Sequence, residues 1–244
     1  MMGILNATPD SFSGDGCVDP PSLAARARAL ADEGADVLDL GGESTRPGAI
    51  AVSEQEELER VLPALAALRQ EAGGLPISVD TTKAAVAEAA VVAGATIVND
   101  VSGLRDARLA EIAARHGAWL VLMYNGRERQ TTVSAAIQSL LEMAERAQRA
   151  GMPRERLIAD PGIGFVRTPA ENFELLRGIP AIKDAVGLPL LVGPSRKFGR
   201  GKPEATAAAV AIATFLGADV VRVHDVAGAV VASRVAAAIR YRTS

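Results

Sequence analysis

Short apolar runs recur along the chain, and most of them follow an alanine-rich amphipathic stretch that ends at a glycine. The glycines are Gly34, Gly73, Gly94, Gly117, Gly151, Gly187 and Gly217. A glycine just past a helix adopts the left-handed backbone conformation without a Cβ penalty. Apolar runs that lack polar alternation are typical of strands buried on both faces. The pattern therefore predicts a series of strand–helix units built on a parallel sheet.

Eight such runs are present, at residues 4–5, 37–40, 77–79, 97–98, 120–122, 157–159, 190–192 and 220–223. Eight units in 244 residues leave about 30 residues for each, the size of one βα unit. This predicts an α/β fold of the (β/α)8 TIM-barrel type, with residues 1–244 forming a single domain. An open doubly wound sheet is the alternative that the pattern alone leaves open. No break in composition indicates a second domain.

Helix starts are marked by residues that suit a helix N-terminus. Pro20 and Pro203 favour the first turn because proline has no N–H to satisfy there. Ser53 is a good N-cap, and acidic residues follow it at the positive end of the helix dipole. We expect these acids to form a solvated helix face rather than a metal site: Glu54, Glu56, Glu57 and Glu59.

Composition narrows the functional class. The single Cys17 excludes a disulfide framework and a multi-cysteine zinc site. A net charge of −3 with mixed signs argues against nucleic acid as a partner. No apolar run reaches the roughly 18 residues of a membrane span, and the first residues carry no basic leader region. We therefore expect a cytoplasmic protein that binds neither membrane nor nucleic acid.

Polar residues follow every predicted strand, and in a barrel these strand ends meet at one mouth, where the active site lies. Asp80, Asn99 and Asp160 could bind the edge of a flat heterocycle that carries adjacent N–H and NH₂ donors. Acid–base work on a sugar stays open at this point. Arg222 and His224, with Arg196 and Lys197, suit an anion such as phosphate.

Two further features point to a metal ion and to mobile covers. Asn6 offers an amide oxygen to Mg²⁺, which takes few protein ligands and keeps substrate phosphates. Residues 8–18 and 41–51, rich in glycine, serine and proline, are long enough to act as lids over the mouth.

Seven motifs, in order along the whole chain, resemble those of the dihydropteroate synthase family. GILNATPDSFS at residues 3–13 resembles the family's opening signature, and DLGGESTRPG at 39–48 resembles its second. The remaining matches are SVDT at 78–81, NDVSG at 99–103, DPGIGF at 160–165, SRK at 195–197 and RVHDV at 222–226.

The resemblance implies a TIM barrel that joins 6-hydroxymethyl-7,8-dihydropterin pyrophosphate to p-aminobenzoate and releases pyrophosphate. It also implies Mg²⁺ as cofactor, with Asn6 as its ligand, and a homodimer. By position, the pterin would be held by Asp80, Asn99, Asp160 and Lys197, with Met123 against its ring. The anion would be held by Arg222 and His224. The p-aminobenzoate would be held by Thr45, Arg46, Pro47 and Ser195, with Phe165 as a further substrate-binding position. Asp80, Lys197, Arg222 and His224 form the catalytic set that the resemblance implies.

Several positions depart from the family's pattern. An acidic residue of the first loop is displaced to Asp15, Tyr124 stands where histidine is typical, and Arg167 replaces a lysine. The stretch 198–204 is short, and the chain starts at the first barrel strand without the family's N-terminal hairpin. Two other functions stay open: a non-catalytic pterin-binding paralogue and a pterin-binding methyltransferase domain. The methyltransferase domains usually lack the SRK motif.

Overall fold

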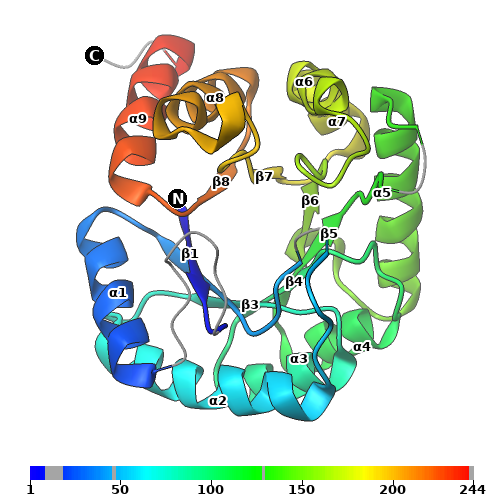
Figure 1. The fold of residues 1–244 in the computed structure, drawn as a ribbon. Helices are drawn as coiled ribbons and strands as arrows, with labels where there is room; N and C mark the ends of the chain where they lie inside the picture. Colours follow the sequence, from blue (N-terminus) through cyan, green and yellow to red (C-terminus); the bar gives the residue numbers. More distant parts are fainter. Residues whose placement is uncertain (9–18, 46–47, 128–129, 242–244) are drawn as a thin grey trace.

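Eight parallel strands form a nearly closed barrel that helices surround (Figure 1). The computed structural model describes residues 1–8, 19–45, 48–127 and 130–241. The strands are β1 (Met2–Asn6), β2 (Val37–Gly41), β3 (Ile77–Asp80), β4 (Ile97–Asp100), β5 (Trp119–Met123), β6 (Leu157–Asp160), β7 (Leu191–Val192) and β8 (Val220–Val223). The predicted single-domain TIM-barrel architecture is confirmed, and the open doubly wound sheet is excluded.

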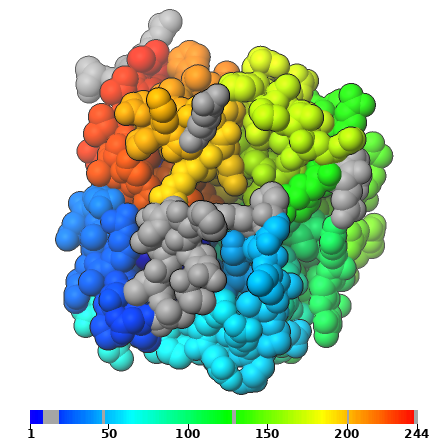
Figure 2. All heavy atoms as spheres, in the orientation of Figure 1, coloured from blue at the N-terminus to red at the C-terminus, as the bar shows by residue number. Residues whose placement is uncertain are grey.

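The helices form the outer ring (Figure 1), and the colours of successive parts of the chain follow one another round the molecule (Figure 2). They are α1 (Pro20–Asp32), α2 (Glu54–Glu71), α3 (Ala84–Val92), α4 (Arg108–His116), α5 (Val133–Arg149), α6 (Pro169–Arg177), α7 (Ile179–Val186), α8 (Pro203–Leu216) and α9 (Val226–Tyr241). Two short 3₁₀ turns, η1 (Arg154–Arg156) and η2 (Gly199–Gly201), complete the regular elements. Within the described chain, no helix is both long and apolar enough to cross a membrane.

Two helices, α6 and α7, occupy the connection between β6 and β7, where the pattern predicts one. Gly178 ends α6, and Pro180 lies in the first turn of α7. A Cβ at Gly178 would lie 2.4 Å from Val133 Cγ2, so the residue between α6 and α7 lies close against α5. The proline has no N–H to continue the preceding helix, and a new helix therefore starts there.

The strand order is β6-β5-β4-β3-β2-β1-β8-β7, and the ring closes between β6 and β7. A single parallel bridge, Ala159 to Leu190, makes this closure, supported by a 2.9 Å bond from Ala159 N–H to the Pro189 carbonyl. Strand β7 has only two residues, so this is the weakest seam of the barrel.

The glycines that were expected to end helices have positive φ angles, all seven of them. At Gly217, for example, φ is 113° and the N–H bonds back to the Ala213 carbonyl. An L side chain at that angle would strain the backbone, so the sequence needs glycine there.

One apolar layer closes the floor of the barrel. Met2, Ile97, Val121, Ile158 and Leu191 pack together, each from a different strand, and Val37 and Val220 pack against them. Side chains on a strand alternate between faces, so the residue two positions later points to the same interior. The next interior layer is therefore Ile4, Asp39, Asp80, Asn99, Met123, Asp160, Gly193 and Arg222. The functional site is built on this layer.

Candidate active site

A pocket at the barrel mouth lies on this second interior layer. Seven of the eight layer residues line it, and Asp39 lies beneath. The loops after the strands supply the rest of the wall. They contribute Thr8, Glu43, Ser44, Thr45, Val101, Ile163, Phe165, Ser195, Lys197 and His224, and Asn6 adds the end of β1. Because side chains alternate between the two faces of each strand, the barrel interior has an apolar layer at its floor and a mostly polar layer above it, which lines the pocket.

Arg222 is the central cation of the pocket floor. Its Nε donates to Asp39 Oδ2 and its Nη2 to Asp80 Oδ2, each at 2.6 Å. Burial alone would lower the pKa of Arg222, but the ion pairs with these two carboxylates raise it well above its ordinary value. The guanidinium is therefore charged, and its hydrogen bonds to Asp39 and Asp80 fix its orientation.

Two buried acceptor atoms belong to residues that line the pocket, and neither has a hydrogen-bond partner among the described residues. They are Asp80 Oδ1 and Asn99 Oδ1. Asn99 presents its oxygen because its Nδ2 donates to both Asp39 oxygens, at 3.3 and 3.4 Å. A buried acceptor left without a donor costs about 1–3 kcal/mol. The pair is therefore suited to a ligand that brings hydrogen-bond donors.

The carboxyl groups of Asp80 and Asp160 have pKa values above the ordinary value for aspartate. Burial raises the pKa of Asp80 to about 7, with Asp39 acting in the same direction and Arg222 against it. Burial also raises the pKa of Asp160 to about 7, opposed by the Gly162 N–H, which donates to Oδ1 at 2.7 Å. Perturbed carboxyls grouped in a pocket are typical of functional sites.

Lys197 and His224 come from the last two barrel loops. The Lys197 side chain passes directly over Gly164, where a Cβ would lie 2.4 Å from Lys197 Cδ. Gly164 also has a φ of 91°, which L side chains rarely adopt, so the backbone favours glycine there. His224 Nδ1 lies 2.8 Å from Ser195 Oγ, which fixes the imidazole ring and the hydroxyl relative to each other. Both histidine and hydroxyl line the pocket.

Phe165 forms one wall with Met123 and Val101, the apolar part of the pocket. The guanidinium of Arg127 lies 4.3 Å from the centre of the Phe165 ring, and Lys197 Nζ lies 5.5 Å from it. Arg127 Nη2 also donates to the Thr45 carbonyl at 2.9 Å. The β5 loop thereby holds the segment after β2 against the Phe165 wall.

The structure brings together the predicted residues that it describes. One pocket is lined by Asn6, Thr45, Asp80, Asn99, Met123, Asp160, Phe165, Ser195, Lys197, Arg222 and His224. Arg46, Pro47 and the lid residues 9–18, with Asp15 and Cys17, lie outside the described residues.

The structure also identifies a residue that sequence reasoning left without a role. Asp39 ends up under the floor, where it orients both Arg222 and Asn99. Asp39 lies two residues after Val37, which packs against the apolar floor layer, and this spacing indicates that the Asp39 side chain points into the barrel. Tyr124, which departs from the family pattern, is wholly buried and does not line the pocket.

One expectation was wrong. Glu57 does not belong to a solvated acidic face, because its side chain is 0% exposed and pairs with Lys83 at 2.5 Å. It points inward because α2 packs on the barrel and the fourth residue after Ser53 falls on its buried side.

As for a metal site, the described residues contain no cluster of three or more His, Cys, Asp or Glu side chains that could hold an ion.

Comparison with known families gives a match over nearly the whole chain. The family model described as pterin binding enzyme matches residues 2–224. Dihydropteroate synthase from Bacillus subtilis is 43% identical over 239 residues, which cover 93% of this chain and 83% of that one. The chain belongs to the dihydropteroate synthase family. The methyltransferase alternative is thereby set aside.

Solved structures of dihydropteroate synthases agree with this barrel. The Xanthomonas albilineans enzyme with 4-aminobenzoic acid is 42% identical and superimposes with a TM-score of 0.89, covering 98% of this chain and 92% of that one. The Clostridium difficile enzyme with pteroic acid is 41% identical, also with a TM-score of 0.89, covering 99% and 96%.

Proposed function

We propose that the pocket joins 6-hydroxymethyl-7,8-dihydropterin pyrophosphate to p-aminobenzoate and releases pyrophosphate. As a member of the dihydropteroate synthase family, the protein is a transferase of folate biosynthesis. The single observation that carries the assignment to this pocket is the pair of buried acceptors, Asp80 Oδ1 and Asn99 Oδ1. A 7,8-dihydropterin carries N–H donors on two sides of its ring system, and these two oxygens suit the donors on the side away from Asp160.

The pterin edge would lie across the three strand ends β3, β4 and β6. Asp160 would accept from the 2-amino group and the neighbouring ring N–H, while Asp80 and Asn99 accept from the other side of the ring. Met123 would pack on the ring face, and Lys197 would donate to an acceptor of the ring. Each of these side chains lines the same pocket.

Pyrophosphate would lie at the side of the mouth formed by β8 and β1. Arg222 and His224 offer charge and hydrogen bonds, and Asn6 offers an amide oxygen. A single amide oxygen suits a Mg²⁺ ion carried by pyrophosphate, because Mg²⁺ takes few protein ligands and keeps substrate phosphates. When bound there, the ion would neutralise charge on the leaving pyrophosphate.

The reaction needs a protein that stabilises a cation. When the C–O bond to pyrophosphate breaks, its electron pair leaves with the oxygen and the dihydropterin becomes a resonance-stabilised cation. Asp80 and Asp160, ionised above about pH 7, would lie beside the ring that carries this charge. The amine of p-aminobenzoate then forms the C–N bond and loses a proton. Covering the mouth would exclude water, which would otherwise attack the cation.

The p-aminobenzoate would lie between the segment after β2 and the Phe165 wall. Thr45 and Ser195 line this part of the pocket, and Arg46 and Pro47 follow Thr45 directly. The ring of Phe165 carries two cations close to its face, Arg127 and Lys197, which favour a benzoate anion nearby. A relative, the Xanthomonas albilineans enzyme, has been solved with 4-aminobenzoic acid.

The protein would act as a cytoplasmic homodimer. Support for the dimer comes from large apolar side chains exposed on α8 and α9: Ile212, Phe215, Val231, Val235 and Ile239. An exposed apolar face of this kind is typical of protein–protein contacts. Sedimentation of the purified chain tests the dimer, and a monomer at micromolar concentration would contradict it.

A direct assay tests the proposed reaction. Purified protein is incubated with dihydropterin pyrophosphate, p-aminobenzoate and Mg²⁺, and dihydropteroate and pyrophosphate are quantified. The expected result is equal amounts of the two products. Pterin binding without product would instead identify a non-catalytic pterin-binding paralogue.

A further inference from the structure

Lys83 is a cation in an electrostatically unfavourable place. It lies at the N-cap of α3, and its side chain makes no capping bond. The N-terminus of a helix carries partial positive charge and favours anions, so a lysine there is destabilising unless something compensates. A residue that breaks a local rule often serves a function elsewhere in the fold.

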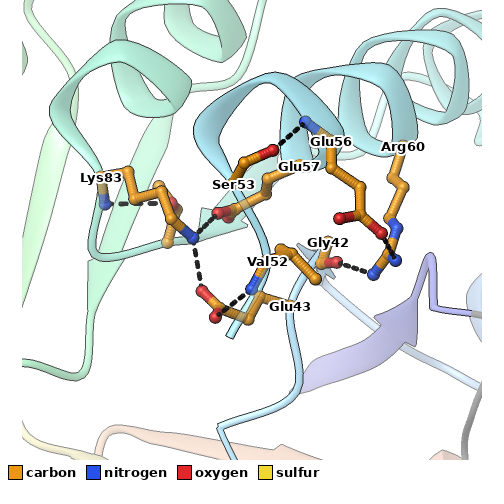
Figure 3. A network of polar contacts seen from close by, with 9 residues as sticks. Gly42, Glu43, Val52, Ser53, Glu56, Glu57, Arg60 and Lys83 are labelled. Carbon is orange, nitrogen blue, oxygen red and sulfur yellow. Dashed lines mark hydrogen bonds and ion pairs between the residues drawn. The ribbon is translucent and has the colours of Figure 1, made fainter. Parts of the chain in front are cut away.

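Two carboxylates compensate Lys83 (Figure 3). Its Nζ lies 2.6 Å from Glu43 Oε2 and 2.5 Å from Glu57 Oε2. Burial would lower the pKa of Lys83, but the hydrogen bonds to Glu43 and Glu57 outweigh it and raise the pKa. The ammonium is therefore charged throughout the physiological range. It links the end of β2 to the first turn of α2.

Glu43 uses its other oxygen to close the loop that starts there. Glu43 Oε1 accepts from the Val52 N–H at 3.1 Å, immediately before Ser53 caps α2 (Figure 3). The same carboxylate thus binds Lys83 and joins the two ends of the segment 43–52. That segment carries Thr45 to the pocket.

The residue before Glu43 is held from the other side. The Gly42 carbonyl accepts from Arg60 Nη1 at 3.0 Å. A Cβ on Gly42 would lie 2.7 Å from Val61 Cγ2, so the residue after β2 lies against α2 where only glycine fits. Because Gly42 and Glu43 are both fixed, Ser44 and Thr45 start from a fixed base. Lys83 itself does not line the pocket.

We propose that Lys83 is a positioning residue for the p-aminobenzoate part of the pocket, acting through Glu43 and Glu57. The proposal rests on the function given above, in which Thr45, two residues after Glu43, contributes to the p-aminobenzoate part of the pocket. The strand ends that face the pterin are fixed by the barrel itself, so Lys83 affects one substrate and not the other.

Substitution of Lys83 tests this, with Lys183 as the matched control. Lys183 also pairs with a carboxylate, Asp219 at 2.6 Å, but on α7 and away from the pocket. For Lys83→Met we expect the KM for p-aminobenzoate to rise about tenfold, the scale of the lost charge-assisted hydrogen bond to Glu43. The pterin Kd, measured by calorimetry, is expected to stay within about twofold, and Lys83→Arg to restore most of the loss. Lys183→Met should change neither constant.

Glu43→Gln supplies a second test in case Lys83→Met does not fold. It leaves the ion pair between Lys83 and Glu57 intact, so the buried charge of Glu57 stays neutralised. It should raise the KM for p-aminobenzoate severalfold with the pterin Kd unchanged. The proposal is overturned if both constants shift together, or if folded Glu43→Gln keeps the parent KM. The parent enzyme is assayed first, so a failure of the proposed reaction itself is seen separately as absence of dihydropteroate.

Discussion

Asp39 and Arg222 form a 2.6 Å ion pair under the pocket floor, although 183 residues separate them in the chain. They come from β2 and β8, the two neighbours of β1 in the barrel. The Asp39 side chain is 0% exposed and that of Arg222 is 20% exposed. The pair explains how one arginine can face the pocket and still have a fixed orientation.

Removing Arg222 should therefore affect stability as well as anion binding. In Arg222→Ala, Asp39 and Asp80 would remain as buried carboxylates without their cation, at a cost of about 3–5 kcal/mol. Pyrophosphate binding should weaken by about 1.5–3 kcal/mol, the scale of a charge-assisted hydrogen bond. Urea unfolding and pyrophosphate titration measure the two effects. The double variant Asp39→Asn, Arg222→Ala should recover part of the stability, and equal stability of single and double variants would contradict the pairing.

Pterin binding should depend on pH near neutrality. The pKa values of Asp80 and Asp160 are raised from 3.8 to about 7, so both carboxyls gain protons as the pH falls through 7. A protonated carboxyl presents a donor to the donors of the pterin. We expect the pterin Kd to rise at least about tenfold from pH 8 to pH 6, the effect of one such protonation. A Kd that is constant over this range would show that neither carboxyl binds the pterin ionised.

The same shifts predict the direction of the pH effect on folding. Between about pH 4 and pH 7 the folded state holds more protons on these two groups than the unfolded state does. Their contribution to stability is present below pH 4 and is lost as the pH rises through 7. The ionised carboxylates that pterin binding needs therefore lower the free energy of unfolding.

Unbroken apolar runs and helix-end glycines made most of the fold predictable from the sequence. Gly34 and Gly217 mark helix ends because only glycine adopts those φ angles readily, and the apolar runs could only be buried strands. The extra helix break at Gly178 was missed because its cause, close contact with Val133, is tertiary.

The site residues were predictable where they end strands, as Asp80 and Asp160 do. The roles of Asp39 and Glu57 were not, because each depends on a partner far away in the chain, Arg222 or Lys83. In the case of Lys83, a lysine before a helix with no cap was a local sign of such a distant partner.

Gly164 should be essential for the placement of Lys197. Gly164→Ala puts a methyl group 2.4 Å from Lys197 Cδ and forces alanine to a φ of 91°. Pterin affinity should fall about tenfold or more as the ammonium moves and its charge-assisted hydrogen bond is lost. Gly73→Ala is the matched control, because Gly73 also has a positive φ, 62°, with nothing near its Cβ position. If Gly164→Ala binds pterin as tightly as Gly73→Ala does, the added methyl group does not displace Lys197 from the pterin.

Removal of Mg²⁺ should separate the two halves of the donor substrate. With a chelator present, turnover should stop while a pterin without pyrophosphate binds as before, because the ion would contact only the pyrophosphate. Asn6→Ala should raise the Mg²⁺ concentration for half-maximal turnover by about tenfold, equivalent to ~1.4 kcal/mol of lost interaction. An unchanged Mg²⁺ requirement in this variant would remove Asn6 from the metal site.

The most direct test of the account is calorimetric titration of a pterin into Asp160→Asn beside the parent protein. Asparagine has one acceptor and turns an NH₂ group toward the pterin donors, so two charge-assisted bonds are lost. The expected cost is roughly 3–5 kcal/mol, about 10²–10⁴ in affinity. The melting temperature at pH 8 should rise by about 2–4 °C, because a buried ionised carboxylate has been removed. A folded variant that binds pterin as tightly as the parent would contradict the pterin site, and with it the proposed reaction at this pocket.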